Sequence, residues 1–587
     1  MDSRITKKDY LIIVIITVLY ALMALINLGD RTAPQTGWVP EGLNREFIIN
    51  FDEEKDLDKI MYYCGLGEDW YSVAALDVFY LNDSGDYEQI TRLEKESSTM
   101  FKWKDAPLPV RTSSLKFVSD YFKSEDGTIK GIRGEFFEIA VYEKGSEQPV
   151  PIKELIELTD KTKGTEKLFD EQEFAVYTST YMNTTYFDEV YFPRTAYEYI
   201  NNISPYENTH PPLGKIIIMW GIQLFGFTPF GWRVFGALFG AMMIPLMYVF
   251  GKRIFKTTFL AFVCAFLMMF DFMHFTQTRI GTVDGYLCFF IILMFYYMYK
   301  YFMQKSYEIK FRFTIYPLLM CGIFFGLAAS VKWIGLYAGA GIAFLFFLKQ
   351  LLELRANKKG LIEQEHFFRK TMLPTLLLCL IFFIIIPVCI YYLSYLPVFK
   401  ATGSENHIAD FLSSQKHMYS YHAGVTSAHP YASPWWQWPA DIRPVYFYQM
   451  KNPPEGMWGA IASFGNPLIW WTGFGCLFST AVIALKKKDK RAVFIFAAYL
   501  SLYLPWIIAP RKITFLYHYF SLVPFIIFAI AYNIEHLLKK KRKYRKMVIL
   551  YLILVAVLFA VFYPALSGTM VPLKYIESLR WLPSWYF

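Results

Sequence analysis

Long apolar segments separated by short polar loops dominate the chain. A helix needs about 20 mostly apolar residues to cross a bilayer. About eleven segments approach or exceed this length: 10–28, 231–250, 257–275, 284–302, 315–332, 334–352, 372–394, 459–485, 492–509, 513–534 and 547–566. A further apolar stretch, 213–226, is shorter, and we expect an interfacial or partly embedded helix there. The pattern predicts a mostly α-helical, polytopic membrane protein.

Residues 44–152 follow a different pattern. Runs such as "EFIINFD" and "FFEIAVYE" alternate apolar and polar positions, and turn-rich stretches such as "NDSGD" separate them. Alternation broken by turn residues predicts a β-sandwich, here a jelly-roll-like domain inserted in the first outer loop. The stretch "GLGEDWYSVAALDVFY" weakly resembles a discoidin-like, carbohydrate-binding domain. A spacer or substrate-positioning domain without a sugar site is the alternative interpretation.

The distribution of charge predicts how the helices are oriented. The chain has 587 residues and a net charge of +9, but its basic residues gather in short loops such as "GKRIFK", "KKKDKR" and "KKKRKYRK". This is the pattern of cytoplasmic loops in membrane proteins and not that of a nucleic-acid groove. We therefore expect an uncleaved signal anchor at the N-terminus, with the N-terminus in the cytoplasm and the C-terminus outside.

With this orientation, the loops expected outside contain few basic residues after the β-rich domain, and each of these is a candidate ligand. They are Arg279, Lys332, Arg511 and Lys512. Only one of the seven cysteines, Cys64, lies in the outer β-rich domain, so we expect no disulfide within it. The expected domains are an anchor (1–30), a β-rich domain (31–180), a catalytic outer loop (181–230), helices two to seven (231–394), a His- and Trp-rich outer loop (395–458), helices eight to eleven (459–566) and an outer tail (567–587).

Two adjacent carboxylates, Asp188 and Glu189, stand among aromatic residues in "YFDEVYF". They lie just before the membrane core, on the side where the unexpected cations gather. A carboxylate opposite several cations suits chemistry on a lipid-linked phosphate, because the cations hold the phosphate while the acid takes a proton from the attacking group. The structural alternative is that the two acids merely begin a helix.

Several ordered blocks resemble the protein O-mannosyltransferase family, which uses polyprenyl-phosphate sugars and has the GT-C fold. They are "YFDEVYFPRTAYEYI", "THPPLGK", "FMHFTQTRIGTVDGYL", "GLAASVKWIGLY", "HPYASPWWQWP" and "RKITFLYHY", spread over most of residues 180–535. The resemblance implies that Asp188 is the general base, accepting the proton of a Ser or Thr hydroxyl, and that Glu189 shapes the same pocket. The chain is similar to bacterial members of the family.

The resemblance also implies roles for residues along the later blocks. Those expected to bind the donor phosphate and lipid are Arg511, Lys332, Arg233, Arg279 and Lys215. Those expected to bind the acceptor or the sugar are His210, Asp284, His429, Trp435 and His518. The alternatives are cations that bind lipid headgroups, aromatic residues that anchor the protein at the interface, and structural histidines.

These features together predict an inverting membrane enzyme of the bacterial cell membrane. It is expected to transfer a sugar, with mannose favoured by the family, from a polyprenyl-phosphate carrier to Ser or Thr of exported polypeptides. We infer no metal or other cofactor, although an Asp–Glu pair leaves a divalent ion open. The alternative acceptors are a lipid or a cell-wall polymer. A transporter or a polysaccharide-binding membrane protein is the alternative of another class, but ionisable residues gathered at one interface favour the enzyme.

Overall fold

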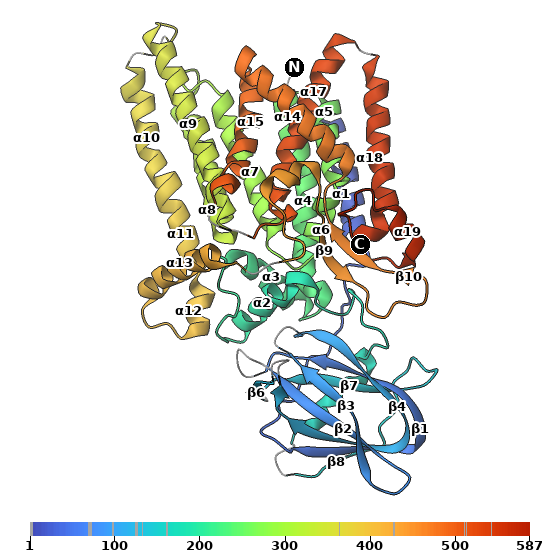
Figure 1. The fold of residues 1–587 in the computed structure, drawn as a ribbon. Coiled ribbons are helices and arrows are strands. Elements are labelled where there is room, and N and C mark those ends of the chain that lie inside the picture. Colours follow the sequence, from blue (N-terminus) through green and yellow to red (C-terminus); the bar gives the residue numbers. More distant parts are fainter. Residues whose placement is uncertain are drawn as a thin grey trace. The chain divides into compact units, whose positions relative to one another are not determined.

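The computed structural model describes residues 4–67, 73–96, 99–123, 127–131, 133–159, 163–362, 364, 366–426, 429–509, 511, 513–541 and 543–587 (Figure 1). The chain divides into two compact units. The first, the helical unit, consists of Met1–Ile26, Glu198–Trp220 and Arg233–Phe587. The second, the β unit, consists of Asn27–Tyr197 and Gly221–Trp232. The β unit therefore extends past the expected boundary at residue 180 and includes the Asp–Glu motif.

The expected membrane helices are present. Among the described residues, ten helices are long and apolar enough to cross a membrane: α1 (Lys7–Leu25), α4 (Pro229–Phe255), α7 (Asp284–Met303), α8 (Phe311–Val331), α9 (Ile334–Lys358), Phe368–Thr402, α14 (Pro467–Lys487), Lys490–Ile508, Leu516–Lys540 and α18 (Tyr544–Ser567). The pair α5 (Thr258–Met269) and α6 (Phe272–Thr278) would make an eleventh, bent by 58°. The chain is an integral membrane protein, and the short apolar helix α3 (Leu213–Phe225) lies where an interfacial helix is expected.

Three of these spans are assembled from shorter elements. Phe368–Thr402 contains α10 (Leu373–Leu380), α11 (Ile386–Leu393) and α12 (Leu396–Thr402), with π-helical turns at Phe368–Met372 and Ile381–Ile385. Lys490–Ile508 contains α15 (Lys490–Tyr503) and α16 (Pro505–Ile508). Leu516–Lys540 contains a 3-10 turn, Leu516–Leu522, followed by α17 (Val523–Lys540).

Buried polar contacts and small residues hold the helices together. The break between α5 and α6 falls at Asp271, whose carboxylate accepts hydrogen bonds from the backbone of His274 (3.0 Å) and from the indole of Trp470 (2.8 Å). The first helix is held by Asp9, which accepts from Lys252 at 2.9 Å and from Tyr248 at 2.8 Å. Because a buried charge is costly unless it is paired, these contacts fix where α1 begins against α4.

Several shorter elements follow the sixth apolar span. The helix α13 (His407–Gly424) lies beside α12 (Figure 1) and packs through Phe411, Gln415 and Met418, which recur at helical spacing. The remaining elements are a 3-10 turn (Trp435–Ala440), the antiparallel pair β9 (Val445–Gln449) and β11 (Ala460–Ser463), the pair β10 (Met457–Trp458) and β12 (Val571–Pro572), and α19 (Leu573–Ser578).

The β unit contains one antiparallel sheet of six strands rather than two separate sheets. Its order is β3 (Tyr87–Lys95), β2 (Ala74–Leu81), β4 (Lys102–Asp120), β1 (Glu46–Cys64) and β7 (Phe136–Glu143), and β8 (Glu154–Glu157) also pairs with β1. A single sheet results because β1 is long enough to pair with β8 along its first half and with β7 along its second. Register shifts interrupt β1 at Asn50/Lys55 and Leu57/Lys59, where strands bend most easily.

The core of the β unit lies on the apolar faces of these strands. Phe47 of β1 and Phe117 of β4 are fully buried and stack with ring centroids 4.9 Å apart. A separate pair, β5 (Phe122–Lys123) and β6 (Ile129–Gly131), lies off the main sheet. The discoidin-like interpretation falls partly on residues 68–72, which lie outside the described residues, and the role of this unit stays a prediction.

Candidate active site

The Asp–Glu motif occupies a 3-10 turn, Phe187–Val190, just before α2 (Phe192–Ile200) in the β unit. Glu189 is fully buried, and its carboxylate accepts the backbone N–H of Tyr186 at 3.2 Å. Asp188 is partly exposed. The two adjacent acids therefore differ in their surroundings: Glu189 closes the turn on itself, while Asp188 lies at the surface of the turn.

A cavity of about 150 Å³ in the helical unit gathers three of the predicted residues. His210, Lys332 and Arg511 all line it, although they are far apart along the chain. The other lining residues are Thr209, Pro211, Trp333, Ile334, Tyr337, Tyr419, His422, Trp506 and Ala509. We call this cavity the cationic pocket. Lys512, the neighbour of Arg511, lies outside the described residues.

Lys332 follows the last residue of α8, and a buried carboxylate holds it in place. Its ammonium donates to Asp284, the first residue of α7, at 2.9 and 3.2 Å, and both side chains are buried. The same ammonium lies 5.5 Å from the ring centroid of Tyr517. Arg511 is oriented differently, because its Nε donates to the backbone oxygen of Ile513 at 2.9 Å. Asp284 therefore acts on the pocket through Lys332.

The loop that carries His210 is held by a buried acid, Glu207. One carboxylate oxygen of Glu207 lies 2.8 Å from Nδ1 of His210, and the other accepts from Lys215 at 2.5 Å. Burial alone would raise the pKa of Glu207, but the charges of Lys215 and His210 and their hydrogen bonds outweigh it and hold this pKa well below its usual range. Burial lowers the pKa of His210, so that the ring is neutral near pH 7.

A second histidine of the pocket comes from α13. Nε2 of His422 donates to the backbone oxygen of Thr209 at 2.8 Å, and its ring lies 5.1 Å from that of His210. Burial, together with the nearby charges of His210 and Arg511, lowers the pKa of His422 to about 3. On the same helix, Nε2 of His417 lies 2.9 Å from the side-chain oxygen of Asn208. Helix α13 therefore contacts the loop before α3 through two histidines.

Hydrogen bonds also connect α13 to the start of α9. The indole of Trp333 donates to the hydroxyl of Tyr391 at 3.0 Å, and this hydroxyl donates to Gln415 at 2.8 Å. Gln415 in turn donates to the hydroxyl of Tyr395 at 3.0 Å. This series of contacts fixes α13, and with it Tyr419 and His422, beside Trp333 on the wall of the cationic pocket.

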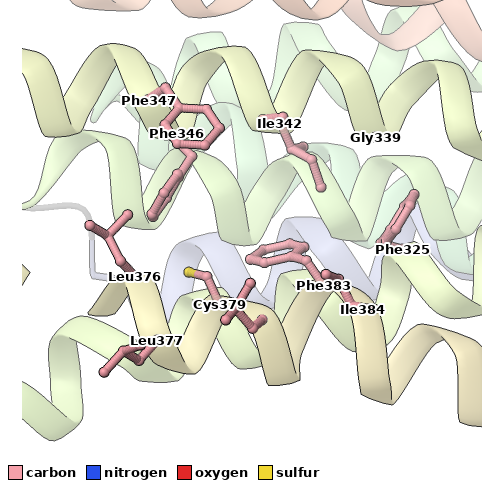
Figure 2. Close-up of a pocket in the computed structure, with 12 residues that line it drawn as sticks. Phe325, Gly339, Ile342, Phe346, Phe347, Leu376, Leu377, Cys379, Phe383 and Ile384 are labelled. Carbon is pink, nitrogen blue, oxygen red and sulfur yellow. The ribbon is translucent and has the colours of Figure 1, made fainter. Parts of the chain in front are cut away.

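A larger apolar cavity of about 510 Å³ lies further along α9 (Figure 2). Side chains of α9 and of the α10 span face one another across it, and Phe325 of α8 lies at one end. Its lining begins at Gly339, two residues after Tyr337 of the cationic pocket. We call this cavity the apolar groove. A helix rises about 1.5 Å per residue, so the two cavities occupy successive turns of one helix.

The remaining predicted residues lie outside the lining of the cationic pocket. Arg279 donates to the backbone oxygens of Met23, Ala24 and Ile26 at 2.8–3.1 Å, which satisfies carbonyls at the end of α1. Arg233 is fully buried near the start of α4. The charge of Lys215 is paired with Glu207. For all three, contact with the donor stays a prediction.

The aromatic and histidine predictions are likewise spread out. His429 is exposed and packs edge-on against Phe515, with ring centroids 4.9 Å apart. Trp435 packs edge-on against Tyr503 at 5.5 Å. His518 is buried, and its ring lies 4.6 Å from that of Trp506, a lining residue of the cationic pocket. These contacts place His518 nearer to the pocket wall than sequence alone could indicate.

The sequence interpretation missed two residues. Glu207 stands three positions before His210 in "ENTH", and an acid so close to a histidine and a lysine was an available signal. His422 lies in "MYSYHAG", more than 200 residues from the Asp–Glu motif, and only the fold brings it to His210. Trp333 and Tyr337 adjoin the predicted Lys332, so their presence follows from that prediction.

One group of side chains in the described part of the chain has the spacing of a metal site. Glu138, Asp170 and Glu171 of the β unit have ligand atoms within 4.8 Å of one another. Burial raises the pKa of Glu138 to about 9, and the backbone of Glu171 donates to it at 3.1 Å. Thr36 donates to both Asp170 and Glu171. The acids are therefore satisfied by hydrogen bonds, and metal independence of the enzyme stays a prediction.

Comparison with known proteins agrees with this arrangement. Residues 228–402 match the family described as dolichyl-phosphate-mannose-protein mannosyltransferase, and residues 407–585 match the C-terminal four-transmembrane region of protein-O-mannosyltransferase. A polyprenol-phosphate-mannose–protein mannosyltransferase of Corynebacterium glutamicum is 24% identical over 470 residues, covering 69% of this chain and 89% of that protein. A Mycobacterium tuberculosis protein of the same description is 25% identical over 464 residues, covering 68% and 87%.

The fold has a solved counterpart. The protein O-mannosyltransferase Pmt1–Pmt2 complex of Saccharomyces cerevisiae aligns with a TM-score of 0.59 and 15% identity, covering 69% of this chain and 89% of that one. The arrangement of helices is that of the GT-C class of membrane glycosyltransferases. Since the two family regions together match more than half of the chain, it belongs to the protein O-mannosyltransferase family.

Proposed function

We propose that this enzyme transfers one mannose from a polyprenyl-phosphate carrier to a Ser or Thr hydroxyl of an exported polypeptide. The relatives are named for polyprenol-phosphate-mannose and for protein acceptors. The observation that carries the proposal is the cationic pocket, which brings His210, Lys332 and Arg511 together at one end of α9, with the apolar groove further along the same helix.

The two cavities match the two halves of such a donor. A phosphodiester is anionic, and its phosphate gains further negative charge as the bond to the sugar breaks. Fixed cations stabilise that developing charge, and Lys332 is already oriented by Asp284 before any ligand arrives. The apolar groove exposes almost only carbon atoms and suits an isoprenoid chain. Together they support Lys332 and Arg511 as ligands of the donor phosphate.

In the reaction that we propose, Asp188 is the general base. The acceptor oxygen attacks the anomeric carbon from the side opposite the phosphate, so that the configuration inverts. The new carbon–oxygen bond forms while the bond to the phosphate oxygen breaks, and the electron pair leaves with the phosphate. The hydroxyl proton passes to Asp188. Glu189 supports this role by closing the turn that carries Asp188, and the cations fulfil the electrostatic role without a divalent ion.

The proposed reaction takes place outside the cytoplasm. The basic clusters after α4, α14 and α17 occupy the opposite ends of their helices from the cationic pocket, as expected for cytoplasmic loops. This orientation leaves the N-terminus in the cytoplasm and the pocket, the Asp–Glu motif and the C-terminus on the outer side.

Replacement of the proposed base tests the mechanism. In membrane vesicles supplied with polyprenyl-phosphate-mannose and a Ser/Thr acceptor peptide, we expect Asp188→Asn to lower the transfer rate by roughly a hundredfold or more. Binding of the donor should change little, because the cations that hold the phosphate are intact. Asp83→Asn, in an exposed turn of the same unit, is the matched control and should keep the full rate.

Two results would contradict the proposal. Full activity of Asp188→Asn would remove the assignment of the base. Labelled sugar found in the lipid or polymer fraction, with none on protein, would show that the acceptor is of another class. Mass spectrometry of exported proteins from cells with and without the gene would identify the acceptor and the sugar together.

A further inference from the structure

One ring nitrogen on the wall of the cationic pocket lacks a partner. Nδ1 of His422 is buried, and no other described residue forms a hydrogen bond with it. The opposite nitrogen, Nε2, is occupied by the backbone oxygen of Thr209 at 2.8 Å. A buried polar atom without a partner costs free energy, so its presence beside a candidate substrate pocket calls for an explanation.

The contact with Thr209 determines what the unpartnered nitrogen can do. A carbonyl oxygen can only accept, so Nε2 of His422 must carry the hydrogen. The ring is neutral at pH 7 because burial and neighbouring positive groups disfavour its protonated form. A neutral ring has one hydrogen on its two nitrogens, so Nδ1 carries none and is an acceptor. It therefore requires a donor of a hydrogen bond.

The surroundings narrow the identity of that donor. The nearby cations are engaged in part: the ammonium of Lys332 donates to Asp284, and Nε of Arg511 donates to Ile513. A phosphodiester has no hydrogen to donate, and an isoprenoid chain is apolar. The part of the proposed donor that carries hydroxyl groups is the sugar, which is bonded directly to the phosphate.

We propose that Nδ1 of His422 accepts a hydrogen bond from a hydroxyl group of the sugar carried by the donor. This inference rests on the proposed function, because it takes Lys332 and Arg511 as the ligands of the adjacent phosphate. It makes His422 a residue that selects the sugar. A sugar without that hydroxyl would leave Nδ1 buried and unpaired, and sites built to pair a hydroxyl reject such analogues strongly.

Two substitutions separate the two nitrogens of His422. In His422→Gln the amide nitrogen reaches approximately the place of Nε2 and can still donate to Thr209, but no acceptor stands at Nδ1. In His422→Asn the shorter amide reaches the place of Nδ1, and the contact with Thr209 is lost. The first variant therefore removes the proposed sugar contact, and the second removes the contact that positions α13 against the loop.

The test uses the full-length enzyme in vesicles and a series of polyprenyl-phosphate-mannose donors that each lack one sugar hydroxyl. For the wild type, we expect one deoxy donor to lose about tenfold in kcat/KM relative to the others. His422→Gln should lose about tenfold on the complete donor and nothing further on that one deoxy donor. Equal further losses on every deoxy donor would overturn the proposal.

A second measurement covers the case in which His422→Gln folds poorly. Polyprenyl phosphate without sugar should inhibit the wild type and the variant with the same inhibition constant, while KM for the complete donor rises only in the variant. A parallel rise of both constants would show a structural role and overturn the proposal, as would a rise of KM for the acceptor peptide alone. Failure of the proposed function is distinguishable, because the wild type would then not transfer mannose at all.

Discussion

At the scale of single residues, the pocket depends on which ionisable groups are paired. Glu207 pairs with Lys215 and His210, and Asp284 pairs with Lys332, so two of the predicted cations are held by buried acids. His422 makes no ion pair in the described part of the chain, and its ring is neutral because it is buried among positive groups. The pocket therefore combines cations of fixed orientation with histidines that resist protonation.

This difference predicts how stability depends on pH. An unfolded histidine titrates near pH 6.5, whereas His422 in the fold has a pKa of about 3. Below pH 6.5 the unfolded chain binds more protons, so stability falls as the pH falls between these values. The carboxyl of Glu207 has a lowered pKa, so the stability that it contributes is lost only below about pH 4.3, the usual pKa of a glutamate.

We therefore expect the melting temperature of the detergent-solubilised enzyme to be lower at pH 5.5 than at pH 7.5. One neutral histidine accounts for at most about tenfold in the unfolding equilibrium constant at pH 5.5. His422→Gln should show a smaller drop than the wild type over the same range. An identical drop in the two proteins would show that His422 titrates normally in the fold.

At the scale of elements, close packing of α8 against the π-helical span shapes the apolar groove. Gly322 of α8 stands so close to this span that an added Cβ would lie 2.0 Å from the backbone oxygen of Phe382. Gly326, one turn later, would bring a Cβ to 2.8 Å from Pro387. π-helical turns are uncommon inside helices and often occur at functional sites. The second of them, Ile381–Ile385, supplies lining residues of the apolar groove.

Glycine-to-alanine substitutions test this packing. We expect Gly322→Ala to destabilise the enzyme by about 1–3 kcal/mol, because the backbone of the neighbouring span must move. Gly475→Ala is the matched control on α14, where an added Cβ meets no described atom within 4 Å. Melting in detergent would measure both variants. If Gly322→Ala melts with the control, α8 does not approach the π-helical turn as closely as the structure indicates.

At the scale of the whole molecule, the orientation in the membrane decides which substrates the enzyme meets. The basic residues of the last turns of α4, α14 and α17 are expected in the cytoplasm, and the sheet of the β unit outside. A reversed orientation would give the Asp–Glu motif access to cytoplasmic proteins and not to exported ones. Orientation is therefore a condition of the proposed function.

Cysteine labelling checks the orientation directly. Ser84→Cys lies in the exposed turn between β2 and β3, and Lys487→Cys lies exposed at the end of α14. On intact cells, we expect a membrane-impermeant maleimide to label the first variant and not the second. After permeabilisation both should react. The opposite pattern on intact cells would refute both the orientation and the proposed site of reaction.

The sequence by itself determined the features that depend on local patterns. Apolar runs of sufficient length predicted the spans, because a helix in lipid must be apolar whatever its neighbours are. Alternation predicted strands in the β unit for a similar reason, since one face of each strand meets the core. The ordered motifs predicted the family, and unexpected cations in outer loops pointed to Lys332 and Arg511.

Only the tertiary structure decided which of these residues meet. The sequence could not show that Arg279 serves the end of α1, that Lys215 is neutralised by Glu207, or that α13 brings His422 to His210. It also could not show that the strands of the β unit form one sheet, because pairing depends on how far β1 and β4 extend and bend. The physical reason is common to all these cases: local patterns record the solvent that a segment meets, whereas contacts between distant segments depend on how the whole chain packs.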